Sequence, residues 1–181
     1  MKKIILGIVG VLAAVIVVIL VIAATKSDDF RVERHTSIHA APSALFPIVN
    51  DLHRFPDWSP WQRLDPHMTT SFEGPAAGPG ASYAWRGNDD VGEGRMTITR
   101  SQPDSIVEIR LEFLKPWQAT NMVEWRIEPE GDGSRVSWIM TGKSAFMMKV
   151  ITVFMDMDSM VGADFEKGLA QLKQIGESTH G

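Results

Sequence analysis

The feature that most constrains this sequence is an uncharged apolar run from Ile4 to Ala24. The run has 21 residues, and only Gly7 and Gly10 within it fall outside the apolar class. As a helix it would be roughly 31 Å long, which matches the ~30 Å hydrocarbon core of a bilayer. The sequence therefore predicts a single-pass membrane protein, with a transmembrane signal anchor at residues 1–25.

The charges that flank the apolar run predict its orientation. Lys2 and Lys3 precede the run, whereas Thr25, Lys26, Ser27, Asp28 and Asp29 follow it, and positive flanking charge favours the cytoplasmic side. We therefore expect the rest of the chain outside the cytoplasm, in the periplasm or the extracellular space. The alternative is a signal peptide cleaved near Ala24, but the apolar core of such a peptide is normally only ~7–15 residues long.

The remaining sequence is long enough for one folded domain, which we expect over residues 30–178. After the anchor there are 16 basic and 22 acidic residues, and this net charge of −6 argues against a nucleic-acid binder. Because the chain has no cysteine, it has no disulfide, thiolate metal site or cysteine nucleophile. We expect neither a metal nor a cofactor, because none of the histidines has metal-ligand spacing: His35, His39, His53, His67 and His180.

Alternation of apolar and polar residues predicts the strands of this domain. The clearest case is Ser105 to Phe113, which has the pattern of a half-buried antiparallel strand. The same pattern returns over Ala119 to Pro129 and again over Val136 to Thr141, so these segments predict a three-stranded meander. The other expected strands are Phe30 to His39, Met68 to Glu73, Ala81 to Arg86 and Gly94 to Ser101.

Helical spacing is evident in two segments. Pro42 to Val49 predicts a short helix, and Ser159 to Gly176 predicts a long one in which Phe165 and Leu172 share a face, with Asp158 or Ser159 as its cap. We therefore expect an α+β fold, in which a curved antiparallel sheet of about six or seven strands wraps around the long C-terminal helix. An apolar space between sheet and helix is a natural small-molecule pocket.

Several stretches carry a family resemblance: the first strand from Val32 to Ile38, Ala41 to Asp51, Phe55 to Trp61, and Gly162 to Leu169 followed by Leu172-Lys173. In these, and over nearly all of Phe30 to Ile175, the chain resembles the helix-grip superfamily, also called SRPBCC or START-like. This superfamily includes START lipid-transfer domains, Bet v 1-like proteins and the polyketide cyclase/dehydrase and lipid transport group. The resemblance implies a helix-grip fold that binds lipids, sterols, polyketides or other hydrophobic ligands. It also implies that a minority of such proteins are cyclases or dehydratases.

The expected ligand-binding residues are mostly large aromatic side chains, which combine apolar area with a polar N–H or O–H group. They are Trp58, Trp61, Tyr83, Trp85, Leu111, Phe113, Trp125, Trp138, Met140 and Phe165. Strand alternation puts Glu124 and Arg126 on the face opposite Trp125, and it turns Arg86 outward if Tyr83 and Trp85 face inward. The inward residues are then mainly apolar, which favours binding over catalysis.

Three hypotheses for the function follow. The first is a membrane-anchored protein that binds or transports a hydrophobic small molecule or lipid. The second is a polyketide cyclase or dehydratase, in which Tyr83 is the one residue to test for catalysis; the third is a protein-interaction domain with a filled cavity. The apolar stretch Phe146 to Met160 is interpreted as a lid over the pocket mouth, an interfacial segment touching the bilayer, or a core helix. Neither the ligand nor the oligomeric state is predicted.

Overall fold

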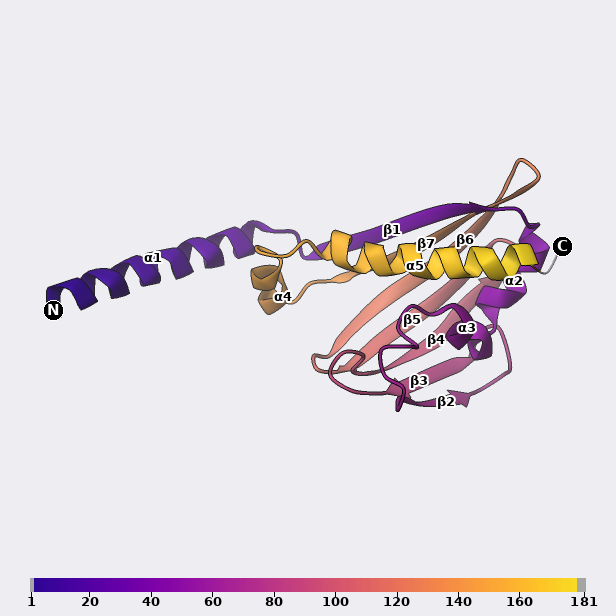
Figure 1. Ribbon diagram of the computed structural model, residues 1–181, viewed down its shortest axis with the longest axis horizontal. Helices are drawn as coiled ribbons and strands as arrows, with labels where there is room; N and C mark the ends of the chain where they lie inside the picture. The colour runs from indigo at the N-terminus through magenta and orange to yellow at the C-terminus, as the bar shows by residue number, and fades with distance from the viewer. Residues whose placement is uncertain (1, 179–181) are drawn as a thin grey trace.

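The computed structural model describes residues 2–178, so His180 lies outside the described residues. Figure 1 shows a long N-terminal helix that projects away from a curved sheet. This helix, α1, spans Lys2–Thr25, and of its residues Ala23 alone is buried. By length and composition α1 can cross a membrane, a test that a signal sequence also passes.

The sheet is antiparallel throughout, and within residues 2–178 it has seven strands in the order β1-β7-β6-β5-β4-β3-β2. The strands are β1 (Asp29–Ile38), β2 (Thr69–Glu73), β3 (Ser82–Arg86), β4 (Glu93–Gln102), β5 (Ile106–Lys115), β6 (Ala119–Glu130) and β7 (Gly133–Lys143). Each lies within a few residues of its predicted position. The expected α+β fold, with a curved sheet and a C-terminal helix, is confirmed.

The alternation that predicted the strands also determines which side chains enter the core. In β5, Val107 and Ile109 are buried, whereas the intervening Glu108 is only half-buried. Trp125 of β6 lies directly opposite Trp138 of β7, and both are buried. Cross-strand neighbours have Cβ atoms ~4.5–5.5 Å apart on the same face, so the two indoles enter the core side by side.

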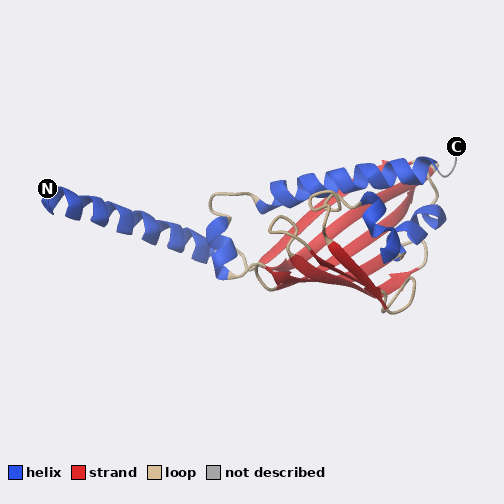
Figure 2. Cartoon of the chain, turned by 60° about the horizontal axis from the view of Figure 1, so that its bottom comes forward, coloured by secondary structure: helices blue, strands red, loops and turns tan. Residues whose placement is uncertain are grey.

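The helices cover one side and one end of the sheet. They are α2 (Pro42–Asn50), the 3-10 helix η1 (Leu52–Arg54), α3 (Phe55–Trp58), α4 (Phe146–Ile151) and α5 (Met157–Ser178). In Figure 2, α5 lies along one face of the curved sheet, and α2 and α3 lie near the C-terminal end of α5. Helix α5 buries Phe165, Leu169 and Leu172 against the sheet, as its spacing predicted.

The N-terminal cap of α5 differs from the prediction. Asp156, rather than Asp158 or Ser159, accepts hydrogen bonds from two backbone N–H groups, those of Asp158 (3.3 Å) and Ser159 (3.2 Å). Asp158 is instead bound by Arg34 of β1, whose Nη1 and Nη2 donate to its carboxylate over 3.0 and 2.9 Å. Arg34 also donates from Nε to Glu166 over 2.9 Å. The cap prediction was wrong because α5 begins at Met157, which puts Asp158 and Ser159 inside its first turn and Asp156 at the cap position.

The apolar stretch from Phe146 to Met160 is not a core helix. Its first part forms α4, which contacts the end of α1, and large side chains such as Met147 and Phe154 are exposed. Within the described residues, Met160 is the one member of this stretch that lines the cavity described below. The core-helix interpretation is therefore wrong, and the lid and bilayer-contact interpretations stay predictions.

Candidate functional site

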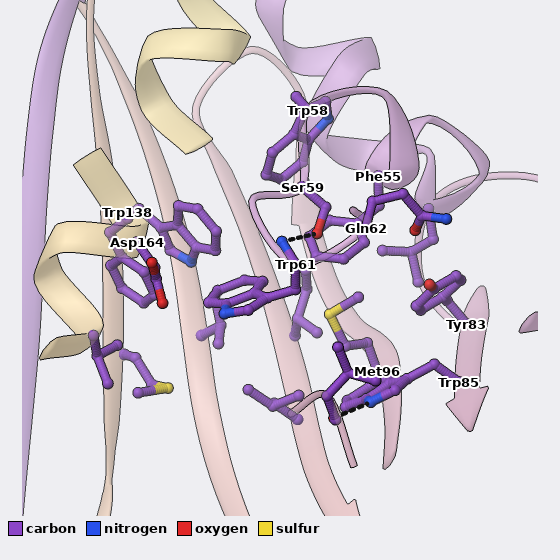
Figure 3. Close-up of a pocket in the computed structure, with 18 of the residues that line it drawn as sticks. Phe55, Trp58, Ser59, Trp61, Gln62, Tyr83, Trp85, Met96, Trp138 and Asp164 are labelled. Atoms are coloured by element: carbon purple, nitrogen blue, oxygen red, sulfur yellow. Dashed lines mark hydrogen bonds between the residues drawn. The ribbon is translucent and has the colours of Figure 1, made fainter. Parts of the chain in front are cut away.

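A cavity of about 310 Å³ lies between the sheet, the segment from α2 to α3 and helix α5. Figure 3 shows Trp138 and Asp164 on one side of this cavity and Tyr83 and Trp85 on the other, with Trp61 between them. The strands contribute alternate residues, because only every second side chain of a strand points to the concave side. The cavity therefore has the place that the sequence predicted, between sheet and C-terminal helix.

All ten residues that were predicted to bind a ligand line this cavity: Trp58, Trp61, Tyr83, Trp85, Leu111, Phe113, Trp125, Trp138, Met140 and Phe165. The prediction omitted other lining residues, among them Phe55, Met96 and Val123. Met96 and Val123 occupy inward positions of β4 and β6, so the alternation of those strands was a signal that could have found them. That any of these residues contacts a ligand stays a prediction.

The wall of the cavity next to α5 is an aromatic cluster. Trp138 is stacked on Phe165, with ring centroids 4.1 Å apart and planes 4° from parallel, and on Trp125 at 4.5 Å. Trp58 meets Trp125 and Trp138 edge to face, at 5.2 and 5.6 Å. Such offset or edge-to-face pairs are favourable beyond the area that they bury. The Trp138 indole is held on several sides, so this wall is rigid.

Two polar atoms of the cluster lack a partner. Within residues 2–178, the Nε1 atoms of Trp58 and Trp138 are buried and have no hydrogen-bond partner. By contrast, Nε1 of Trp85 donates to the backbone oxygen of Val91 over 3.0 Å. Most buried side-chain polar atoms in proteins are hydrogen-bonded, so these two donors are exceptions; both lie inside the packed cluster, where neither solvent nor the cavity reaches them.

The mouth of the cavity lies between the β3–β4 turn and the start of α5. Of the lining residues that the structure describes, Asp90 and Met160 are the two that are exposed. Asp90 belongs to the turn, and Met160 belongs to the first turn of α5. The guanidinium of Arg34 packs against Gly162 so closely that a Cβ there would overlap it. Arg34 thereby fixes the part of α5 that borders the mouth.

The ionisable groups that line the cavity are separate from one another. Burial raises the pKa of Tyr83 to about 12, so its hydroxyl keeps its proton near neutral pH. Asp51 accepts a hydrogen bond from the backbone N–H of His53 over 2.9 Å, and Asp164 pairs with Lys167 over 2.8 Å. In the described part of the chain, no hydrogen bond or ion pair joins Tyr83, Asp51, Asp90 or Asp164 to another of these four.

The charged residues that the alternation placed outside are indeed turned away from the cavity. Arg86 pairs with Glu93 over 2.9 Å, and Arg126 pairs with Glu124, and the cavity wall includes none of these four described residues. Among residues 2–178 there is also no group of three or more His, Asp or Glu side chains that could hold a metal ion. The expected absence of a metal or cofactor stays a prediction.

A curved antiparallel sheet, closed by one long helix over an apolar cavity, defines a helix-grip protein with an internal ligand-sized space. The family model described as polyketide cyclase/dehydrase and lipid transport matches residues 29–177, and the chain belongs to this family. The resemblance found in the sequence is therefore confirmed.

Solved structures with the same fold share little sequence with this chain. The KanY protein (ms6282) has a TM-score of 0.62 at 15% identity, covering 83% of this chain and 99% of its own. Protein CV1439 from Chromobacterium violaceum has a TM-score of 0.58 at 12% identity, covering 83% and 97%. The di-domain ARO/CYC protein StfQ has a TM-score of 0.59 at 12% identity, covering 83% and 51%. No curated protein matches this chain.

Proposed function

We propose that this protein binds a hydrophobic small molecule or a lipid in its cavity, next to a membrane that α1 crosses. The observation that carries the proposal is the cavity itself, of about 310 Å³, whose wall is mostly aromatic and aliphatic. Small-molecule pockets have volumes of roughly 300–1,000 Å³ and are lined mainly by apolar side chains with a few polar groups. Membership of a family that includes lipid transport supports the same class of ligand.

The hydroxyl of Tyr83 favours a ligand that is not a pure hydrocarbon. A buried donor without a partner costs about 1–3 kcal/mol. The Tyr83 hydroxyl lines the cavity and keeps its proton near neutral pH, so an oxygen acceptor on the ligand, such as a carbonyl, ester or hydroxyl oxygen, would satisfy this donor. The proposed ligand is therefore an apolar molecule that carries at least one oxygen acceptor.

The enzyme hypothesis has less support from this cavity. StfQ is described as an ARO/CYC protein from the steffimycin biosynthetic pathway, and Tyr83 is the residue that we would assign to such chemistry here. With a pKa of about 12, the Tyr83 hydroxyl can donate a hydrogen bond, but it is a poor general base near neutral pH. The hypothesis of a filled cavity is disfavoured by the open space between the sheet and α5.

Native mass spectrometry of the full chain, extracted in detergent and followed by organic extraction, tests the proposal. The matched variants are Leu111→Trp and Arg110→Trp, which add the same indole on neighbouring residues of β5. Leu111 is half-buried and lines the cavity, whereas Arg110 is exposed on the other face of the strand. We expect a co-purifying apolar molecule in the wild type and in Arg110→Trp, and its loss in Leu111→Trp.

Two outcomes would contradict the proposed function. One is equal ligand occupancy in Leu111→Trp and Arg110→Trp, because a ligand inside the cavity must compete with the added indole. The other is a wild-type protein that carries no apolar molecule and takes up none when phospholipid and isoprenoid extracts are offered. Circular dichroism of both variants shows whether the sheet is intact.

A further inference from the structure

An exposed apolar surface lies next to the end of α1. It consists of side chains from α4 and from the turn that follows α4: Phe146, Met147, Ile151, Phe154 and Met155. Phe154 is 70% exposed, Met147 61% and Phe146 49%. A soluble protein rarely leaves a contiguous patch of large apolar side chains in water, so this surface needs a partner. We refer to these five residues as the α4 surface.

Reciprocal contacts fix α4 to the segment that follows α1. Nζ of Lys26 donates a hydrogen bond to the backbone oxygen of Thr152, and Nζ of Lys149 donates to the backbone oxygen of Lys26 over 3.1 Å. Lys149 also forms an ion pair with Asp28. Lys149 is only 8% exposed, although it lies on a short helix at the surface. These contacts make a clasp that holds α4 at the point where α1 ends.

The clasp determines how α4 is oriented. It uses the polar side of α4, so the large apolar side chains are turned away from the linker and remain exposed. Figure 1 shows α4 beside the end of α1, at the end of the molecule where α5 begins. If α1 crosses the bilayer, its last residues leave the hydrocarbon core near Thr25, and the clasp then puts α4 at the level of the lipid headgroups.

The α4 surface continues to the mouth of the cavity. Phe154 and Met155 lead through the cap residue Asp156 into the first turn of α5, where Met160 is 54% exposed and lines the mouth. The backbone N–H of Met160 donates to the oxygen of Asp156 over 3.1 Å, which ties this first turn to the cap. Apolar side chains therefore extend from the membrane exit of α1 to the entrance of the cavity.

We propose that the α4 surface is a lipid-contact surface, which rests in the bilayer interface beside α1 and directs the mouth of the cavity toward the membrane. The proposal depends on α1 crossing the bilayer, as the proposed function does. It adds the route by which an apolar ligand passes between bilayer and cavity without crossing water. The partner is the lipid surface rather than another protein, because the clasp makes this surface continuous with the membrane-crossing helix.

The chemistry of the clasp predicts which lipids matter. The charge of Lys149 is paired with Asp28, and Lys26 lies close enough to Asp156 to interact with its carboxylate, so the clasp offers anionic headgroups little net positive charge. The contact then depends on apolar area, and bilayers of pure phosphatidylcholine should support it as well as bilayers that also contain phosphatidylglycerol.

Spin labelling of the full chain in such bilayers tests the proposal. Because the chain has no cysteine of its own, each label attaches only at the introduced cysteine. Nitroxide labels are placed by Phe154→Cys and Met147→Cys on the α4 surface, and by Val11→Cys inside α1. The aqueous control is Asp132→Cys, because Asp132 is 86% exposed in the β6–β7 turn at the other end of the sheet (Figure 1). Accessibility is measured to oxygen, which partitions into lipid, and to a water-soluble nickel chelate.

We expect the Phe154 and Met147 labels to be reached more easily by oxygen than by the nickel chelate, as at Val11, and the Asp132 label to show the reverse. The proposal would be overturned if the Phe154 and Met147 labels were reached more easily by the nickel chelate than by oxygen, as at Asp132, while the Val11 label was reached more easily by oxygen. Spin–spin broadening at Phe154 would also overturn it, because a second copy would then cover the surface. A Val11 label that is reached more easily by the nickel chelate would show that α1 does not cross the bilayer. Ligand occupancy of the cavity is measured separately, by mass spectrometry.

Discussion

Alanine at Gly168 should destabilise the protein, even though alanine is the better helix former. Gly168 lies in α5 against Trp138, and an added Cβ would meet Cζ3 of Trp138 at 2.7 Å and Cδ of Pro60 at 3.3 Å. The indole cannot easily retreat, because it is stacked on Phe165 and Trp125 and meets Trp58 edge to face. The contact must therefore be relieved by displacing an element of the fold.

The two opposing effects can be compared. Replacing glycine by alanine inside a helix is worth at most about 1 kcal/mol in helix propensity. Inserting a methyl group into a packed core typically costs about 1–3 kcal/mol. At 2.7 Å from a rigid ring we expect the cost to prevail, with a net loss of about 1 kcal/mol in the free energy of unfolding. For a domain of this size, that lowers the Tm by about 2–4 °C.

Urea unfolding of the full chain in detergent, followed by far-UV circular dichroism, measures this change. The matched background is Trp138→Phe, which removes the ring atoms that the new Cβ would meet. In that background Gly168→Ala should stabilise the protein by up to about 1 kcal/mol, so that the double-mutant cycle isolates the clash. Stabilisation by Gly168→Ala in the wild type, or an equal effect in both backgrounds, would show that Trp138 does not restrict this position.

Two further predictions concern the ligand and the clasp. Tyr83→Phe should weaken the binding of an oxygen-bearing apolar ligand by roughly five- to tenfold relative to a hydrocarbon of the same shape, measured by displacement of a fluorescent apolar probe; an unchanged preference would contradict a hydrogen bond from the Tyr83 hydroxyl to the ligand. In the clasp, a hydrogen bond and attraction from Lys149 hold the pKa of Asp28 below its ordinary 3.8. The folded pKa lies below the unfolded one, so the stabilisation is complete above pH 3.8 and is lost as the pH falls through the folded pKa. Hydrogen exchange in α4 should therefore be slower in the wild type than in Lys149→Gln at pH 5, with a difference that shrinks below about pH 4; a difference that persists in strong acid would contradict this role for Asp28.

The features that follow from local pattern could be predicted from the sequence. A strand buried on one face must alternate, so the inward positions of Trp125 and Trp138 could be read from their own segments. The long helix was predicted for the same reason, because Phe165 and Leu172 recur at its period. The cavity-lining residues of the strands and of α5 followed from these two patterns together, since whatever points inward from the sheet faces the helix. Trp58 and Trp61 lie outside both patterns and were predicted only as large aromatic side chains.

The features that depend on distant contacts could not be predicted. Asp158 looks like a helix cap in the sequence, and only the folded chain brings Arg34 to it. The mouth of the cavity is marked by Asp90 and Met160, which belong to segments that no sequence pattern relates. The clasp of Lys149 with the end of α1 is of the same kind, because a lysine in an apolar stretch does not reveal its partner.

The strand order has a consequence for how the chain is made. Within the described sheet, β1 is an edge strand whose neighbour is β7, and β1 directly follows α1. During synthesis, β1 is made first but can pair only after β7 has been made. The N–H and C=O groups of β1 therefore stay without their sheet partners while β2 to β6 are made. An unpaired edge is the part of a sheet most prone to join another chain. Insertion into the membrane can precede folding, and a nascent chain held there by α1 is kept apart from its neighbours until β7 arrives.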